Sequence, residues 1–291
     1  MKFAVVAPIA TGVTADPLWM SLFAQHLEAC GFESVIVAEH TVMVSRYSSV
    51  YPYDASGRVD VAADTPIPDP LDLLAFLAGR TERLGLATGV LVLPNHHPVV
   101  LAKRAATVDV LSGGRLRLCV GVGWLKEEIE ACGVEFGSRG RRTDEQLEVM
   151  RLLWQGRPEG VSHRGEFFAF QDAVCLPKPM RHLPIHIGGH SRAAAVRAGR
   201  YGDGFQPLGV TGDRLAELVT IMRDEATRVG RDGVALEVSL GHLVTKIDAD
   251  RAARLAAVGA DRIVLGMPAV TDIDEARDLL SACAERVGLA P

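Results

Sequence analysis

Glu39 and His40 are the first residues along the chain whose types suggest chemistry. They follow an apolar run, Ser34–Ala38, and so lie where a strand would end. A carboxylate beside an imidazole can hydrogen-bond a ligand and exchange a proton near neutral pH. The alternative is a structural pair that satisfies its own hydrogen bonds, and the two residues alone do not separate these interpretations.

A second candidate site is the junction Gly188-Gly189-His190-Ser191. It ends the apolar run Pro184–Gly188 and precedes an alanine-rich segment, Arg192–Tyr201, that has the composition of a helix. Glycines before a helix let backbone N–H groups approach an anion with no Cβ in the way. The pattern predicts a phosphate-binding turn, and a tight turn without a ligand is the alternative.

Two further strand ends carry glycine. One is Thr88-Gly89-Val90, which combines a hydroxyl, a flexible backbone and a branched side chain, and the other is Gly121-Val122-Gly123-Trp124, in which a large planar side chain follows. Together with an imidazole, a carboxylate and a phosphate-binding turn, these ends suit a large planar cofactor that performs the reaction itself.

The sequence offers no convincing metal site and no familiar hydrolase motif. His96 and His97 are adjacent, so their side chains point apart in an extended segment, and no third ligand accompanies them. GxSxG and HExxH are absent. The cysteines are scattered without metal-type spacing, which predicts reduced thiols in a cytoplasmic protein: Cys30, Cys119, Cys132, Cys175 and Cys283.

Composition argues against nucleic-acid and membrane binding. Lys and Arg number 31 against 36 Asp and Glu, a formal net charge of −5, whereas a nucleic-acid-binding protein normally has a basic excess. No apolar stretch approaches the roughly 20 residues of a membrane helix. The short apolar run at the N-terminus predicts a first strand rather than a signal peptide.

Strand-like and helix-like segments alternate along all 291 residues. The expected strands are Lys2–Ala7, Ser34–Ala38, Gly85–Val92, Leu116–Val122, Pro184–Gly188, Gly204–Pro207, Glu237–Thr245 and Arg262–Gly266. The expected helices are Pro17–Cys30, Leu71–Arg83, Pro98–Leu111, Arg142–Trp154, Arg192–Tyr201, Asp213–Val229, Ala249–Val258 and Ile273–Val287. Eight such units predict an α/β protein with a (β/α)8 TIM barrel as one domain, 1–291. A doubly wound sheet is the competitor, but its GxGxxG fingerprint is missing.

Two segments are longer than a minimal connection. Thr41–Pro70 follows the second strand, contains Tyr47, Tyr51 and Tyr53, and is expected to roof a substrate pocket at the catalytic face of the barrel. Arg157–Arg181 predicts a small β excursion between the fourth helix and the fifth strand. A surface or oligomer-contact loop is the alternative for each.

Several stretches resemble the luciferase-like monooxygenase superfamily, and more narrowly its branch of coenzyme F420-dependent oxidoreductases of actinobacteria. They are "VIVAEH", "GLATGVLVLPNHHP", "LCVGVGWLKEEIEACGVEF", "RGRRTDEQLEVMRLLW" and "PIHIGGHSRAAAVRAGRYGDGF". The resemblance is specific from Met1 to about Pro207 and weaker from there to Pro291.

The resemblance implies a tricyclic ring at the carboxyl-end mouth of the barrel. Glu39 and His40 correspond to an acidic–histidine pair that flanks the deazaflavin ring, and a non-proline cis peptide is implied at Gly89–Val90. The turn Gly188–Ser191 falls where the family holds the cofactor phosphate with backbone amides. A homodimer is expected on the same ground.

The chain departs from the family in two places. Members that act on sugar phosphates have a catalytic Glu just after the glycines of the fourth strand, where this chain has Trp124-Leu125-Lys126. Glu127 and Glu128 come later and are expected to face away on a helix. Many relatives also have Arg where this chain has His96 or His97.

These observations predict hydride transfer between F420 and a small organic substrate, with His40 handling the proton. The alternatives are an FMN-dependent luciferase-like monooxygenase and a non-catalytic protein that binds F420 or flavin. The identity of the substrate and the direction of transfer do not follow from the sequence.

Overall fold

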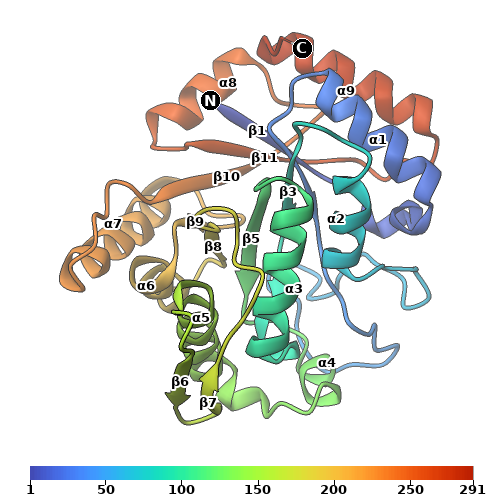
Figure 1. Cartoon of the computed structure of the whole chain (residues 1–291). Coiled ribbons are helices and arrows are strands. Elements are labelled where there is room, and N and C mark those ends of the chain that lie inside the picture. Colours follow the sequence, from blue (N-terminus) through green and yellow to red (C-terminus); the bar gives the residue numbers. More distant parts are fainter. Residues whose placement is uncertain (291) are drawn as a thin grey trace.

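The computed structural model describes residues 1–290. Its nine parallel strands form a closed eight-stranded barrel, because β3 and β4 both pair with β5 and together take the place of one strand. The strands follow the order β3-β2-β1-β11-β10-β9-β8-β5-β4, and β3 also pairs with β5, which closes the ring (Figure 1). The predicted TIM barrel is confirmed. Its strands are β1 (Lys2–Val6), β2 (Ser34–Val37), β3 (Gly85–Thr88), β4 (Leu91–Val92), β5 (Leu116–Gly121), β8 (Ile185–Gly188), β9 (Gly204–Gln206), β10 (Glu237–Leu243) and β11 (Arg262–Gly266).

Helices surround the barrel and follow the strands in turn. Asp16 and Asp69 cap the first two, each followed by proline in the first helical turn, which is a favourable way to start a helix. The helices are α1 (Pro17–Ala29), α2 (Pro70–Ala78), α3 (Pro98–Leu111), α4 (Lys126–Ala131), α5 (Arg139–Gln155), α6 (Arg192–Tyr201), α7 (Gly212–Arg228), α8 (Ala249–Ala257) and α9 (Ile273–Val287). Short 3₁₀ turns occur at Ile9–Thr11, Val13–Ala15, Leu93–Asn95 and Phe136–Ser138.

Three boundaries differ from the sequence prediction in ways that matter for the site. The expected strand Gly85–Val92 is interrupted at Gly89–Val90 and forms β3 and β4. Helix α5 begins at Arg139, three residues before the expected Arg142, directly after a 3₁₀ turn. Helix α4 is not one of the eight helices listed above, although a helix was expected to carry Glu127 and Glu128, and both residues lie in its first turn.

Side chains alternate between the barrel interior and the surrounding helices, as the two-residue period of a strand requires. Ala4, Ile36, Ala87 and Val264 form a small interior cluster, while their larger strand neighbours pack under the helices. Small interior residues leave room for polar side chains at both ends of the barrel.

The amino end of the barrel is filled by a network of paired charges. Arg262 donates to Glu33 at 3.0 and 3.1 Å and to Glu237 at 2.8 Å. Arg117 donates to the other side of Glu33 at 2.9 Å, and His186 lies 3.5 Å from Glu237. This end is therefore closed by groups that satisfy one another.

The long connection after β2 lies at the opposite, carboxyl end (Figure 1). The segment between β2 and α2 runs without a helix or strand from residue 38 to 69. The predicted β excursion is an antiparallel hairpin, β6 (Val161–Arg164) and β7 (Ala169–Ala173). Within residues 1–290, none of the helices has the length and apolarity needed to cross a membrane.

Candidate active site

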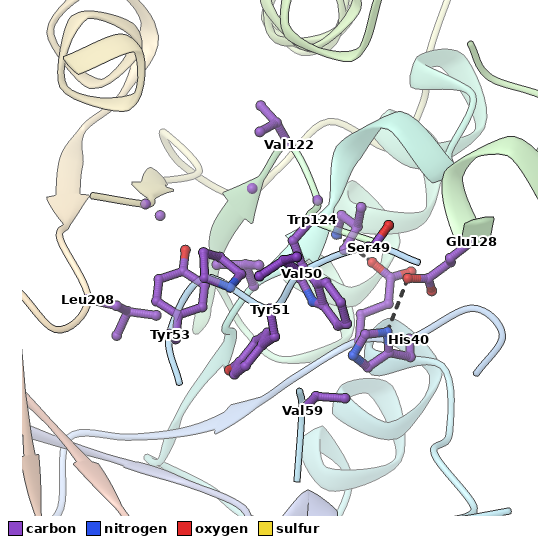
Figure 2. Close-up of a pocket in the computed structure, with 18 of the residues that line it drawn as sticks. His40, Ser49, Val50, Tyr51, Tyr53, Val59, Val122, Trp124, Glu128 and Leu208 are labelled. Atoms are coloured by element: carbon purple, nitrogen blue, oxygen red, sulfur yellow. Dashed lines mark hydrogen bonds and ion pairs between the residues drawn. The ribbon is translucent and has the colours of Figure 1, made fainter. Parts of the chain in front are cut away.

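A cavity of about 1100 Å³ opens at the carboxyl end of the barrel, beneath the segment that follows β2 (Figure 2). All but one of the residues predicted as site residues line it. They are Glu39, His40, Gly89, Val90, Gly121, Gly123, Trp124, Gly188, Gly189, His190 and Ser191. Residues that come from four different strand ends are thus brought to one place, as expected for a TIM barrel.

His40 points into this cavity and is held from behind by Glu128. The His40 Nδ1 atom lies 3.1 Å from a Glu128 carboxylate oxygen, and the other oxygen accepts the backbone N–H of Thr41 at 2.6 Å (Figure 2). The Glu128 side chain is only 2% exposed. A carboxylate at Nδ1 leaves Nε2 as the ring nitrogen free to meet a ligand.

The expectation that Glu128 faces away on a helix was wrong. Glu128 is in the first turn of α4, and that turn packs against the chain just after His40. The sequence did not indicate this contact because β2 and β5 are not neighbours in the barrel, so only the path of the long segment brings them together.

Glu39 supports the site from outside the barrel mouth. Its carboxylate accepts the N–H of Val92 at 2.5 Å and lies 2.6 Å from His96 Nε2. Strand alternation explains the difference from its neighbour, since Glu39 and His40 point in opposite directions. Glu39 therefore fixes β4 and His96, while His40 faces the cavity.

The peptide bond between Gly89 and Val90 is cis, as the resemblance implied. Val90 lines the cavity at the barrel mouth, and its side chain packs against two glycines from other strands. A Cβ on Gly188 would lie 2.5 Å from Val90 Cγ1, and a Cβ on Gly121 would lie 2.9 Å from Val90 Cγ2. Both glycines are thus required by the packing of Val90, a reason that the sequence did not reveal.

Thr88 is the predicted site residue that the structure does not bring to the cavity. Its hydroxyl donates to the Cys119 carbonyl at 2.8 Å and accepts the Cys119 N–H at 3.0 Å. Because Ala87 faces the barrel interior, Thr88 must face the other way. It links β3 to β5 and has no free group for a ligand.

The turn after β8 has two parts with different roles. Gly189 has φ +128°, which only glycine adopts easily, and its N–H is already bonded to the Gln206 carbonyl. Ser191 caps α6 by accepting the N–H of Ala194 at 3.1 Å. The amides available to an anion are therefore those that follow Gly189, at the start of α6.

Two arginines that sequence reasoning missed lie beside this helix start. Arg139 begins α5, and Arg197, on α6, donates to the carbonyl of Gly140 at 3.1 Å and to Asp144 at 2.5 Å. Both line the cavity. Burial, and then the charge of Arg197, lower the pKa of Arg139. The run "RGRR" at residues 139–142 was the signal for this basic corner.

Two buried nitrogens at this corner have no hydrogen-bond partner among residues 1–290. They are Nδ1 of His190 and Nε of Arg139. Unpaired buried polar atoms are costly, so each favours a ligand that supplies an acceptor. Two helix starts, two guanidinium groups and two unpaired nitrogens together suit a phosphate.

Aromatic side chains connect the His40 end of the cavity to this basic corner. Trp124 lies edge-on to His40 (ring centroids 6.2 Å apart) and to Tyr51 (5.0 Å), Tyr51 contacts Tyr53 (5.4 Å), and Tyr53 contacts His190 (4.9 Å). Tyr51 and Tyr53 belong to the segment after β2, which thus roofs the cavity (Figure 2).

Glu127 anchors the roof. Its carboxylate accepts hydrogen bonds from the N–H of Ser48 at 2.6 Å and the hydroxyl of Ser49 at 2.6 Å. The hydrogen bond from the Ser49 hydroxyl is the largest contribution that lowers the pKa of Glu127 to about 2. Glu127 and Glu128 therefore bind two points of one loop, and only Glu128 reaches His40.

The two histidines considered as metal ligands have other partners. His96 is paired with Glu39, and His97 packs edge-on against Phe168 with ring centroids 5.3 Å apart. Among residues 1–290, no group of three or more His, Cys, Asp or Glu side chains is arranged to hold a metal ion.

Comparisons with known proteins agree with this geometry. A family model described as luciferase-like monooxygenase matches residues 1–288. An uncharacterized protein of Mycobacterium tuberculosis (strain ATCC 25618 / H37Rv) is 32% identical over 265 residues, which cover 89% of each chain. An F420-dependent glucose-6-phosphate dehydrogenase of Segniliparus rotundus is 31% identical over 217 residues, 72% of this chain and 59% of the dehydrogenase. Among solved structures, an F420-dependent secondary alcohol dehydrogenase in complex with an F420-acetone adduct has the same fold, with a TM-score of 0.78 at 18% identity over 98% of both chains.

Proposed function

The chain belongs to the luciferase-like monooxygenase family, and we propose that it is an F420-dependent oxidoreductase that transfers a hydride between the deazaflavin and a small organic substrate. Support comes from one observation above all. His40 and the basic corner line the same cavity, so a single ligand with a planar ring and a phosphate can reach both.

The residues at the cavity fit such a cofactor. Val90, packed between Gly121 and Gly188, would support one face of the ring, with Gly123 and Trp124 beside it. The first amides of α6, together with Arg139 and Arg197, would hold the phosphate. The unpaired nitrogens of His190 and Arg139 are the groups that most need this ligand.

The bound deazaflavin supplies a two-electron hydride acceptor or donor with little oxygen chemistry. The chain's own residues orient the substrate and move the proton. His40 Nε2 accepts the hydroxyl proton when an alcohol is oxidised and returns it when a carbonyl is reduced. Glu128 keeps Nδ1 engaged and stabilises the imidazolium that forms, so it acts as a positioning residue.

The preference for F420 over FMN rests on the named relatives, two of which are described as F420-dependent. An FMN-dependent monooxygenase would use the same fold and the same phosphate corner. A cofactor-binding protein without catalysis is the third candidate. These three functions make different predictions in solution.

Hydride transfer is tested by mixing the purified protein with F420 and a panel of alcohols, or with reduced F420 and the matching carbonyl compounds. The absorbance of the oxidised deazaflavin reports the reaction directly. We expect substrate-dependent turnover without oxygen uptake. Oxygen consumption with reduced FMN would favour the monooxygenase, and tight F420 binding without any transfer would favour the non-catalytic protein.

Two lesser expectations belong to the same proposal. We expect a homodimer, which light scattering after size-exclusion chromatography measures. The five free cysteines suit a cytoplasmic location, which fractionation of the source cells tests.

A further inference from the structure

We propose that the substrate of this site is a neutral, apolar alcohol or its carbonyl counterpart, and not a sugar phosphate or another anion. This inference rests on the oxidoreductase function proposed above. It follows from how charge and apolar surface are distributed inside the cavity.

Four cationic side chains line the cavity, and within residues 1–290 none of them pairs with His40 or with the carboxylates of Glu39 and Glu128. They are Arg58, Lys126, Arg139 and Arg197. Arg139 and Arg197 form the corner assigned to the cofactor phosphate. The guanidinium of Arg58 lies 4.6 Å above the ring of Tyr47 and donates to the Tyr47 carbonyl at 3.1 Å. The ammonium of Lys126 lies 3.6 Å from Glu130 on the same helix.

Acidic side chains, in contrast, lie close to the reacting end. Glu128 is 3.1 Å from His40 Nδ1 and buried, and Glu39 follows on the outer side of the same strand end. A phosphate or carboxylate on the substrate would meet these charges in a site that is partly shielded from water, where repulsion is strong. No Lys or Arg side chain of residues 1–290 pairs with either carboxylate to offset that cost.

Apart from Ser49, whose hydroxyl donates to Glu127, the lining beside His40 is apolar or aromatic. Val50, Val59, Tyr51 and Trp124 surround this part of the cavity, and Val122 and Leu208 extend the apolar lining (Figure 2). Burial raises the pKa values of Tyr51 and Tyr53, so both hydroxyls stay neutral. Such a lining binds apolar carbon skeletons and leaves His40 as the polar group that fixes a hydroxyl or carbonyl oxygen.

The proposed step balances as follows. In oxidation the carbinol C–H bond breaks and the hydrogen leaves with both electrons to the deazaflavin, which is reduced. The O–H bond breaks and its proton moves to His40 Nε2 as the C=O double bond forms. Reduction of the carbonyl compound is the reverse.

A matched pair of ligands tests the substrate class without relying on turnover. The protein is loaded with whichever of F420 and FMN it binds more tightly, and 2-hexanone and 5-oxohexanoate are titrated by ligand-observed NMR. The two differ by a terminal carboxylate. We expect the dissociation constant of 2-hexanone to be at least ten-fold lower than that of 5-oxohexanoate. Equal or tighter binding of 5-oxohexanoate would overturn the inference.

A gain-of-charge variant sharpens the test. Val59→Arg brings a cation to the His40 end and should reduce the ratio of the dissociation constants of 5-oxohexanoate and 2-hexanone at least three-fold. Val59→Met, which is of similar length and neutral, should leave this ratio unchanged. If Val59→Met narrows the preference as much as Val59→Arg does, charge is not the cause and the inference fails.

Turnover separates this inference from the proposed function. 2-Hexanol should be oxidised with a kcat/KM at least ten-fold above that of 5-hydroxyhexanoate and of glucose 6-phosphate. A clear binding preference for 2-hexanone without any hydride transfer would contradict the proposed function and leave the substrate class standing. Faster turnover of glucose 6-phosphate would contradict the substrate class and support the oxidoreductase.

Discussion

At the amino end of the barrel, Arg262 lies between Glu33 and Glu237 with every charged hydrogen-bonding group matched. At the carboxyl end, Arg139 and His190 each keep a buried nitrogen without a partner. Both ends use the interior positions of the same strands and the helices around them. The difference fits the function proposed above, in which the amino end serves stability and a ligand completes the carboxyl end. Variants at the two ends should therefore affect different measurements.

The largest effect is expected at His40. His40→Ala should reduce turnover about 10²- to 10⁴-fold, the usual range for a general acid–base group, with little change in cofactor affinity. His40→Asn is the matched variant, because its amide N–H can replace Nδ1 as donor to Glu128 but cannot shuttle a proton. Equal loss in both variants, measured as kcat with saturating cofactor, assigns the effect to proton transfer. Full activity of His40→Asn would remove that role.

At the amino end, Arg262→Met should act on folding. Removing this buried cation leaves the partly exposed carboxylates of Glu33 and Glu237 with less compensation, which costs up to about 3–5 kcal/mol of unfolding free energy. Urea unfolding at pH 7 measures it. The folded fraction should still bind the cofactor normally. Weakened cofactor binding with an unchanged free energy of unfolding would contradict the different roles assigned to the two ends.

Arg139→Ala should lower cofactor affinity more than stability, because the contacts of its guanidinium within residues 1–290 are confined to Phe136 in the turn before α5. Loss of a charge-assisted hydrogen bond, worth about 1.5–3 kcal/mol, corresponds to about 10- to 100-fold weaker binding. Arg141→Ala is the control, since Arg141 is on the same helix but pairs with Glu166 at the surface. Equal effects of the two substitutions on the dissociation constant would point to general electrostatics rather than to a built phosphate site.

The amino end should also show a specific acid sensitivity. Burial, and then the charges of Arg117 and Arg262, lower the pKa of His186 to about 3, whereas an unfolded histidine titrates near 6.5. Between these two pKa values the unfolded chain binds a proton at His186 and the native state does not. The contribution of His186 to the free energy of unfolding is therefore complete above pH 6.5 and is lost as the pH falls toward 3.

In this pH range the free energy of unfolding changes by about 1.4 kcal/mol per pH unit for this one proton. Between pH 7 and pH 5, wild-type protein should lose about 2 kcal/mol more unfolding free energy than His186→Gln. Parallel pH curves for the two proteins would show that His186 is protonated in the native state.

Much of this architecture was predictable from the sequence, because the barrel is specified by local patterns. Apolar runs and helix-like segments placed most strands and helices within a few residues, and the position of Glu39-His40 after a strand placed them at the mouth. Thr88 was misassigned although the alternation of the strand, counted from Ala87, contained the information.

Other parts of the site depend on contacts between distant segments. Glu128 meets His40 only because the segment after β2 passes over α4. Arg139 reaches the basic corner only because α5 starts early and packs against α6. The glycines at 121 and 188 were predicted as ligand contacts, yet the packing of Val90 requires them. Such contacts have no local sequence signal.

The most direct test of the central claim is a side-by-side measurement of the dissociation constants of purified protein for F420 and FMN by fluorescence quenching. The account predicts clearly tighter binding of F420, and weaker binding of F420 by Arg139→Ala. A clear preference for FMN would contradict the assignment of the cofactor, and absence of binding of either would contradict the assignment of the cavity.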